Sequence, residues 1–475
     1  MIVTMKDIVG VDMNETIHNI NLAIEQDLIS PRQSQAKYGV DYYNNKGDIL
    51  KAEKYYFDAN GEKQVDVTRA NNRVTHSFYP LLVKQKVGYL LGKPMNFMSS
   101  EDGVGDYLNK VLGEKWNSVV QELLKNASNK GDEWLYCYID RDGDFNYLIC
   151  PTEQIIPIYD TAFKTNLEGV IRYYTVTDLS NTEKRYVEFW TADEVMYFET
   201  ISDSLVLVDR KAHFTVNGVD YSFGCVPFIQ FKNNEEQSTD LSLVKDLIDQ
   251  YDKVVSGLAN DLDDIQDTIY VLKGYQGTDP NEFMSNLRYY KLIKVDEDGG
   301  VSKLEVHIPI EAKNSHVKRL EDDIYRLGMG VDVSAEKLGN SSGVALKFIY
   351  SLLDLKADMA ETQFKKSIRH FLKVISTWYE VQTGVGFDRD KVQITFNRSF
   401  IINTKEQITN VVNSIGLVSR ETLLSNHPFV TDVDYEVDTM EREGITPAWL
   451  NTSDVEIDET MTSGGYENTG ENTTD

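Results

Sequence analysis

The sequence predicts a multidomain α+β protein, and three features of its 475 residues lead to that class. The first is a helix over 240–269, whose apolar residues recur every three or four positions. The second is a region from 134 to 234 of short alternating strands, typical of a mostly antiparallel sheet. The third is another seamed helix, at 310–327, which follows a small insert. At ~150 residues per domain, the length allows two to four domains.

Composition and charge limit the possible functions. The formal net charge of -28 argues against a conventional nucleic-acid binder, which neutralises phosphates with clustered Lys and Arg. No apolar run approaches the ~18–20 residues that a membrane span needs, and the first ten residues do not read as a signal peptide. Cys137, Cys150 and Cys225 form neither a disulfide framework nor a Cys-x-x-Cys metal pair. We expect a soluble protein of a reducing cytoplasm, with no membrane partner.

The amino-terminal half is expected to contain helices followed by strands. Apolar residues return at helical spacing within 12–30, 71–97 and 114–128. Alternating segments predict strands at 134–151 (a strand–turn–strand), 155–160, 170–178, 185–199 and 226–234. The turn in the first of these contains Asp140, Asp142 and Asp144, which suggest a calcium loop. Its glycine is the fourth residue rather than the sixth, so a plain turn is favoured over a metal site.

The helix predicted over 240–269 has a heptad seam that would cover one partner helix. The seam residues are Leu241, Val244, Ile248, Tyr251, Val255, Leu258, Leu262, Ile265 and Ile269. At ~1.5 Å per residue such a helix is roughly 45 Å long. Its other faces are acidic, and Ser238, Thr239 and Asp240 supply N-cap candidates. An ordinary bundle helix is the plain alternative.

The insert at 270–308 is expected to hold three short strands, with a hairpin turn at Asp298-Gly299-Gly300. The helix that follows has a seam of Ile310, Val317, Leu320, Ile324 and Leu327. The two seamed helices are therefore predicted to form an antiparallel pair, with the insert as a knob at the far end.

The glycine-rich segment 328–343 has no Gly-Lys-Ser/Thr, so a mobile loop is favoured over a phosphate-binding loop. A long helix is predicted next, at 344–381, with an apolar stripe from Phe348 to Trp378 that we expect in the core. A strand at 391–400 and capped helical pieces follow. The last 25 residues, 451–475, contain no Lys or Arg and are expected to be disordered.

The sequence contains none of the common catalytic motifs. We find no His-Glu-x-x-His pair, Gly-x-Ser-x-Gly elbow, Walker motif or dinucleotide fingerprint. No catalytic residue, metal site or cofactor is therefore predicted. A hydrolase whose site is assembled from carboxylates far apart in sequence stays open as an alternative.

Several stretches together resemble the portal protein family of tailed bacteriophages, of the kind found in long-tailed phages of Gram-positive hosts. The resemblance covers roughly 70–445, and the order of the stretches makes it specific. They are NRVTHSFYPLLVKQKVGYLLGKP (72–94), GDEWLYCYIDRDGDFNYLICPTEQIIPIYD (131–160), FGCVPFIQFKNN (223–234), TDLSLVKDLIDQYDKVVSGLANDLDD (239–264), SSGVALKFIYSLLDLKADMAETQF (341–364) and SRETLLSNHPFV (419–430).

The resemblance implies a structural protein, not an enzyme: a dodecameric ring in the virion, at one capsid vertex, assembled in the host cytoplasm. Double-stranded DNA would pass through the ring. The other implied partners are the terminase motor, the head-tail connector, the scaffold and the major capsid protein. The implied domains are wing (1–237), stem helix (238–269), clip (270–308), second stem helix (309–327), tunnel loop (328–343), long helix of the wing (344–383), wing strand (384–400), helical crown (401–450) and disordered acidic tail (451–475).

Two sets of site residues follow from the resemblance. The tunnel loop is the expected place of close DNA approach, at Val331, Asp332, Val333, Ser334, Lys337, Asn340 and Ser341. Lys337 is the only cation of that loop and could equally be a solvated lysine. Partner docking is expected at clip residues Arg288, Tyr289, Tyr290 and Lys291, which could equally pack within the insert or between subunits. A coiled-coil structural adaptor, in which the two seamed helices close on each other, is the main alternative.

Overall fold

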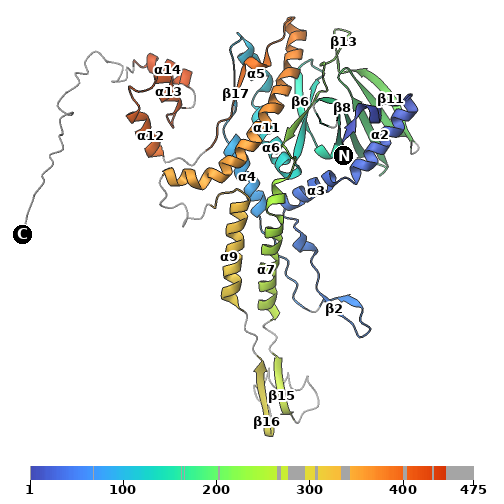
Figure 1. Ribbon diagram of the computed structural model, residues 1–475, viewed down its shortest axis with the longest axis vertical. Helices are drawn as coiled ribbons and strands as arrows, with labels where there is room; N and C mark the ends of the chain where they lie inside the picture. The colour runs from blue at the N-terminus through green and yellow to red at the C-terminus, as the bar shows by residue number, and fades with distance from the viewer. Residues whose placement is uncertain are drawn as a thin grey trace, which may run out of the picture. The chain divides into compact units, whose positions relative to one another are not determined.

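A computed structural model of the chain describes residues 2–67, 69–161, 163–164, 166–201, 204–264, 269–275, 295–304, 309–332, 343–399, 404–430 and 433–444. The chain divides into two compact units. The first is Met1–Gly339 with Phe348–Phe400, and the second is Asn340–Lys347 with Ile401–Asp475. Helices and mostly antiparallel sheets occur together in the first unit (Figure 1), which confirms the α+β class.

A six-stranded sheet of the first unit has the order β1-β7-β8-β9-β10-β11. Its strands are β1 (Val3–Thr4), β7 (Ile155–Tyr159), β8 (Leu167–Thr177), β9 (Glu183–Trp190), β10 (Glu194–Ile201) and β11 (Ser204–Ala212). β1 runs parallel to β7, and the other neighbouring pairs are antiparallel. Helix α2 (Met13–Leu28) buries Ile20 and Ile24 in the same core cluster as Phe189 and Phe198 of this sheet.

A three-stranded sheet shares a core cluster with helices α6 (Lys115–Lys130) and α11 (Gly343–Thr383). Its strands, in order, are β14 (Phe228–Lys232), β5 (Asp132–Ile139) and β6 (Phe145–Cys150). In the β5–β6 turn the Asp140 carboxylate accepts the backbone N–H groups of Asp142 and Asp144, both at 3.0 Å. The turn itself thus uses the carboxylate that a calcium loop would need. Within the described ranges no group of three His, Cys, Asp or Glu side chains is placed to hold a metal.

Smaller elements complete the first unit. The helices are α1 (Met5–Ile8), α3 (Pro31–Tyr43), α4 (Phe78–Leu91) and α5 (Val104–Leu112), with 3-10 turns η1 (Asp48–Lys51), η2 (Thr152–Gln154) and η5 (Arg389–Lys391). The paired strands are β2 (Tyr55–Phe57) with β3 (Lys63–Val65), β4 (Asn96–Ser99) with β17 (Val392–Thr395), and β12 (Phe214–Val216) with β13 (Val219–Tyr221). The strand predicted to reach residue 400 thus ends at Thr395.

Helix α11 buries only part of its predicted apolar stripe. Its carboxy-terminal half is core, with Phe364, Ile368, Phe371, Ile375 and Trp378 buried. Phe348, Leu352, Leu355 and Met359 are exposed instead, so the prediction of one continuous core stripe is wrong for the first half of the helix. In that half a different face of the helix is buried, since Tyr350, Leu353 and Ala357 belong to the main core cluster.

The first seamed helix is shorter than predicted. Asp240–Leu243 form a 3-10 turn (η3), and helix α7 runs from Lys245 to Asp264. Ser242 hydrogen-bonds back to the Thr239 carbonyl at 2.6 Å, a local bond that competes with α-helical pairing. At the other end Ile269 begins strand β15 (Ile269–Tyr275), whose β-branched and aromatic residues favour a strand.

The pairing of the two seamed helices is observed. α9 spans Ile310–Leu327 and lies beside α7 (Figure 1), with the chain running in opposite directions in the two helices. Lys313 and Asp261 form an ion pair between them. Leu320 and Ile324 of the α9 seam are buried, whereas Ile310 and Leu327 at its two ends are exposed.

The insert contains an antiparallel hairpin of β15 and β16 (Val295–Leu304). The predicted turn at Asp298-Gly299-Gly300 is wrong, because these residues lie within β16. The pairing shifts register there: Lys273 faces Gly300 and Tyr275 faces Val295. The extra residues on β16 therefore form a bulge, for which glycine is suited, rather than a turn.

The second unit is helical. It holds α12 (Thr404–Asn413), α13 (Arg420–Ser425) and α14 (Val433–Arg442). The predicted cap at Ser419 forms, since its hydroxyl accepts the N–H of Thr422 at 3.2 Å. The predicted tail at 451–475 lies outside the described residues.

Candidate functional site

The segment predicted to approach DNA is described only at its base. Gly328 to Asp332 are described, whereas Val333, Ser334, Lys337, Asn340 and Ser341 lie outside the described residues. The clip residues Arg288, Tyr289, Tyr290 and Lys291 lie outside them as well. The described base of the loop is held by contacts with α4 and α11.

A side chain of helix α4 holds the base of the loop by binding the backbone of the loop. The Gln85 side chain donates to the Val331 carbonyl at 2.6 Å and accepts the Val331 N–H at 2.9 Å. Gly330 lies so close to α4 that an added Cβ would be 2.2 Å from the Leu82 side chain. Val331 itself is only 2% exposed and belongs to the main core cluster. The prediction that Val331 approaches DNA is therefore wrong, because its side chain is used for packing; Asp332, which follows, is half-buried.

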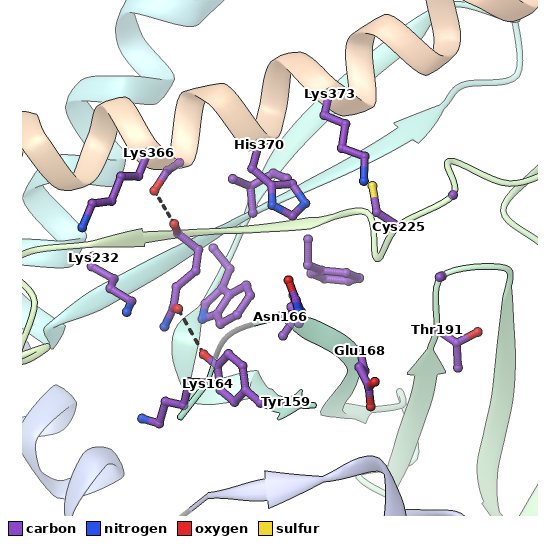
Figure 2. A pocket seen from close by; sticks show the side chains of 18 of the residues that line it. Tyr159, Lys164, Asn166, Glu168, Thr191, Cys225, Lys232, Lys366, His370 and Lys373 are labelled. Atoms are coloured by element: carbon purple, nitrogen blue, oxygen red, sulfur yellow. Dashed lines mark hydrogen bonds between the residues drawn. The ribbon is translucent and has the colours of Figure 1, made fainter. Parts of the chain in front are cut away.

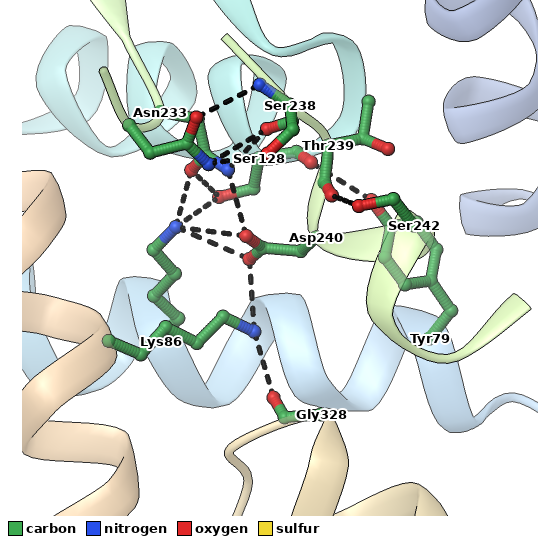
Figure 3. A network of polar contacts seen from close by, with 11 residues as sticks. Tyr79, Lys86, Ser128, Asn233, Ser238, Thr239, Asp240, Ser242 and Gly328 are labelled. Carbon is green, nitrogen blue, oxygen red and sulfur yellow. Dashed lines mark hydrogen bonds and ion pairs between the residues drawn. The ribbon is translucent and has the colours of Figure 1, made fainter. Parts of the chain in front are cut away.

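A buried ionic network lies beside this base and joins four elements (Figure 3). Asp240, just before α7, lies 3.2 Å from Lys86 Nζ on α4 and 3.1 Å from Lys356 Nζ on α11. Lys356 also donates to the Gly328 carbonyl at the end of α9, at 3.0 Å. Asn233 donates to Asp240 at 2.8 Å. One small cluster thus fixes both seamed helices to the body of the first unit.

The network holds two ammonium groups and one carboxylate almost without solvent. The side chains of Lys86, Lys356 and Asp240 are 1%, 4% and 6% exposed. Burial lowers the pKa of Lys86 to about 8, although Asp240 opposes the shift. Burial alone would raise the pKa of Asp240, but Lys356 and Lys86 outweigh it and bring that pKa to about 2. The Asp240 carboxylate therefore stays charged at neutral pH, between the two lysine side chains.

A polar face of α7 holds an extended segment that precedes α4. The Ser256 hydroxyl accepts the Val74 N–H at 3.0 Å, and the Asn260 carbonyl oxygen accepts the Asn72 N–H at 2.6 Å. His76 Nδ1 lies 2.7 Å from the Asp252 carboxylate. The three α7 residues are spaced by four and are buried. These three residues were not predicted as a contact surface, although polar residues at a spacing of four positions are a signal that the sequence contains.

The residues of the predicted heptad seam differ in burial along the helix. Leu241, Val244 and Ile248 are buried against α4 in one core cluster. Further along the helix, Tyr251, Val255 and Leu258 are half-buried and Leu262 is 51% exposed. Ile265 lies outside the described residues, and Ile269 belongs to a strand. Within one chain the seam is therefore apolar core at its start and becomes more exposed toward its end.

A cleft of about 750 Å³ lies between α11, β14 and the β7–β8 connection (Figure 2). Four lysines and His370 line it together with acidic residues. Burial, Lys373 and Arg389 lower the pKa of His370 to about 4. The Ser367 hydroxyl donates to the Gln230 carbonyl, and burial raises the pKa of the Cys225 thiol. Among the described side chains of the cleft no nucleophile is hydrogen-bonded to a base, so the cleft gives no support to the hydrolase alternative.

Comparison with known proteins agrees with this architecture. The model of the family "Phage portal protein, SPP1 Gp6-like" matches residues 32–446. The portal protein of Bacillus phage SPP1 is 37% identical over 417 residues, covering 85% of this chain and 82% of that protein. The portal protein of Clostridium phage phiCD119 is 34% identical over 422 residues, covering 85% of this chain and 91% of that protein.

A solved structure is also similar, though distantly. It is a chain from the neck of a native GTA particle computed with C12 symmetry, with a TM-score of 0.40 and 10% identity. The match covers 74% of this chain and 89% of that chain. No helix in the described ranges is both long and apolar enough to cross a membrane. The family match and the identity to two portal proteins show that the chain belongs to the SPP1 Gp6-like family of phage portal proteins.

Proposed function

We propose that this chain is the repeating subunit of a ring of about twelve copies, through which double-stranded DNA is packaged and ejected. The observation that supports this most strongly is the family match over residues 32–446. The matched range includes α7, α9 and the buried network around Asp240. The ring would sit at one vertex of the capsid, as the head-to-tail connector of the virion, after assembly in the host cytoplasm.

The charge of the chain suits a channel through which DNA slides. Each subunit carries a formal charge of -28, so about twelve copies would surround DNA with a repulsive wall. A wall of ordered lysines would instead release counterions from the phosphates and hold the duplex in place. DNA can slide more easily along a wall that does not bind its phosphates. The same acidic composition that argues against a conventional DNA-binding protein therefore suits a DNA channel.

The tunnel loop would be the part that comes closest to the duplex. Its base is fixed to α4 and α11 by Gln85 and the buried network. The proposed contacts are Asp332, Val333, Ser334, Lys337, Asn340 and Ser341. The only cation among them is Lys337.

The remaining partners would bind elsewhere on the ring. We assign the terminase motor and the head-tail connector to the clip, at Arg288, Tyr289, Tyr290 and Lys291. Contacts with the scaffold and the major capsid protein complete the set. The protein would have no ATPase of its own, because hydrolysis belongs to the motor that docks on it.

Deletion of residues 333–342 tests the role of the loop. The deletion leaves the Gln85 contacts and the Lys356–Gly328 contact in place, so we expect rings of normal mass. We expect packaging to fall at least about tenfold, measured as DNA protected from nuclease inside capsids. The matched control replaces the same ten residues by a Gly/Ser linker of equal length. Normal packaging by the deletion would contradict the assignment of the loop.

A further inference from the structure

The cleft between α11, β14 and the β7–β8 connection gathers lysines at one of its ends. Four lysines and three acidic residues line the whole cleft: Lys164, Lys232, Lys366, Lys373, Glu168, Asp193 and Glu235. Figure 2 shows Lys164, Lys232 and Lys366 together at one end, whereas Lys373 and Glu168 lie toward the other. We call the first of these the lysine end of the cleft.

The lysine end has an excess of positive charge. Its acidic residue is Glu235, which lies 3.2 Å from Lys366 Nζ and accepts a hydrogen bond from Gln363 at 2.9 Å. Lys366, Gln363 and Lys232 lower the pKa of Glu235, so its carboxylate is charged. Lys164 and Lys232 form no ion pair with any residue that the structure describes. Three lysines thus surround one carboxylate, in a chain whose formal charge is -28.

Hydrogen bonds that do not use the lysines fix the shape of this end. Gln230 and Lys232 are two residues apart on β14, so their side chains point to the same face of the sheet. The Gln230 side chain accepts the Tyr159 hydroxyl at 3.2 Å and donates to the Asp132 carboxylate. The Gln230 carbonyl accepts the Ser367 hydroxyl of α11. The strand and the helix are therefore joined beneath the lysine side chains, whose ammonium groups are left available.

A buried donor in the wall of the cleft lacks an acceptor. Trp134 of β5 pairs with Gln230 in the register of the sheet, and it lines the cleft. Its side chain is 0% exposed, and its indole N–H has no hydrogen-bond partner among the described residues. An indole N–H can only donate, so the partner that it needs is an acceptor such as an oxygen atom. The lysines and Trp134 thus present donors without enough acceptors.

We propose that the lysine end of this cleft binds a phosphate group. Lysine binds phosphate as a compact point charge with three donors, and Trp134 adds a neutral donor. The volume of the cleft, about 750 Å³, is within the ~300–1,000 Å³ of small-ligand sites. Because a single phosphate ion would leave most of this volume empty, the expected ligand is a small phosphate ester. The site lies within one chain, so the inference goes beyond the proposed function and does not require a ring.

Isothermal titration calorimetry of the full-length protein tests the site, with AMP as a phosphate ester and inorganic phosphate as the free ion. Sodium chloride keeps the ionic strength equal in all titrations, because salt screens exposed lysines. We expect one site per chain and an affinity for AMP at least about tenfold above that for phosphate, since the ester fills more of the cleft. Equal affinities would support the phosphate site with the free ion as its ligand.

A charge-matched pair of variants separates the site from the overall charge of the chain. Lys232→Gln/Lys366→Gln removes two cations from the lysine end and should lower the affinity for AMP at least about tenfold. The control is Lys84→Gln/Lys110→Gln, which removes the same charge at exposed positions outside the cleft. The control should keep the wild-type affinity within about twofold. Equal unfolding temperatures of the two double variants verify that both are folded.

Lysine acetylation of the wild type gives a second readout that needs no variant. A bound phosphate group covers the ammonium group of Lys232, so AMP should slow the acetylation of this residue at least about fivefold. Lys84, which is exposed outside the cleft, should react at the same rate with and without AMP. Peptide mass spectrometry follows the two positions separately.

The inference is overturned if neither AMP nor phosphate gives a heat of binding with the folded wild type. It is also overturned if the control pair weakens binding as much as the cleft pair, because net charge would then be the cause. Acetylation of Lys232 at an unchanged rate in the presence of AMP would remove the ligand from the lysine end. None of these results bears on ring assembly, so the proposed function would stand in each case.

Discussion

At the scale of single residues, the least ordinary feature is the pair of lysines around Asp240. A fully buried ammonium group is costly, and Lys86 shares its one carboxylate partner with Lys356. The network also receives the Gly328 carbonyl, which lies four residues before Asp332. The hydrogen bonds and ion pairs of the network offset this desolvation cost. They also fix the orientation of α7 and α9 relative to α11 more specifically than a purely apolar contact would.

The Lys86 pKa predicts how the stability of the subunit depends on pH. Its pKa is about 8 in the folded chain, against an ordinary value of 10.5, so the unfolded chain binds more protons between these two values. Stability should therefore rise with pH across that window, by up to about 1.4 kcal/mol per pH unit for this one group. Lys86→Met should remove the rise. Urea unfolding of wild type and variant at pH 8, 9 and 10 measures the difference.

Lys84 provides the control for this prediction, because it is exposed on the same helix. Lys84→Met should leave the wild-type pH dependence in place. A Lys86→Met curve parallel to that of the wild type from pH 8 to 10 would show that Lys86 stays protonated in the folded chain.

The sequence could not predict this site at the level of residues. Lys86 and Asp240 are 154 positions apart, and nothing in their local sequence indicates that they meet. Val331 was misassigned for a related reason. The glycine-rich sequence predicts a loop throughout, whereas Val331 is held in the core beside Gln85, a residue 246 positions earlier in the chain.

At the scale of elements, α7 has two different faces that stabilise it in two ways. Apolar residues at its start pack on α4, whereas Ser256 and Asn260 accept backbone N–H groups from the segment before α4. That segment has no regular secondary structure, so these side chains satisfy N–H groups that a helix or sheet would otherwise satisfy. The polar set therefore fixes the entry of α4 onto the helix pair.

Asn260→Leu tests this role. The substitution keeps the branching and the number of side-chain heavy atoms but leaves the half-buried Asn72 N–H without its acceptor, at a cost of about 1–2 kcal/mol. We expect the Asn72 amide to exchange with deuterium at least about fivefold faster, while amides in the middle of α4 are unchanged. The control is Asn314→Leu, at an exposed position of α9. Equal exchange at Asn72 in both variants would remove Asn260 as the partner that matters.

Periodicity predicted the existence of the elements better than their ends. The antiparallel sheets and the helix pair follow from spacing, because alternation and heptads reflect which face is buried. The break after Asp264 and the bulge in β16 depend on pairing between β15 and β16, which the local pattern does not contain. The same limit applies to α11, where one continuous apolar stripe is core in one half and exposed in the other.

At the scale of the whole molecule, an exposed stripe and exposed ends of the helix pair are features of a subunit rather than of a finished protein. A chain with two or more unfilled apolar faces is expected to bury them in an assembly. The coiled-coil adaptor is not favoured, since the family match spans the sheets and the second unit as well as the helix pair. The resemblance of the six stretches predicted this family membership, because their order along the chain is more specific than any one of them.

Native mass spectrometry of the purified protein tests the central claim most directly, with and without the scaffold protein and alongside negative-stain images. We predict a closed assembly of about twelve subunits, each of 54.2 kDa, with a central hole. A monomer or dimer that persists at high concentration, also in the presence of scaffold, would contradict a ring-forming channel subunit.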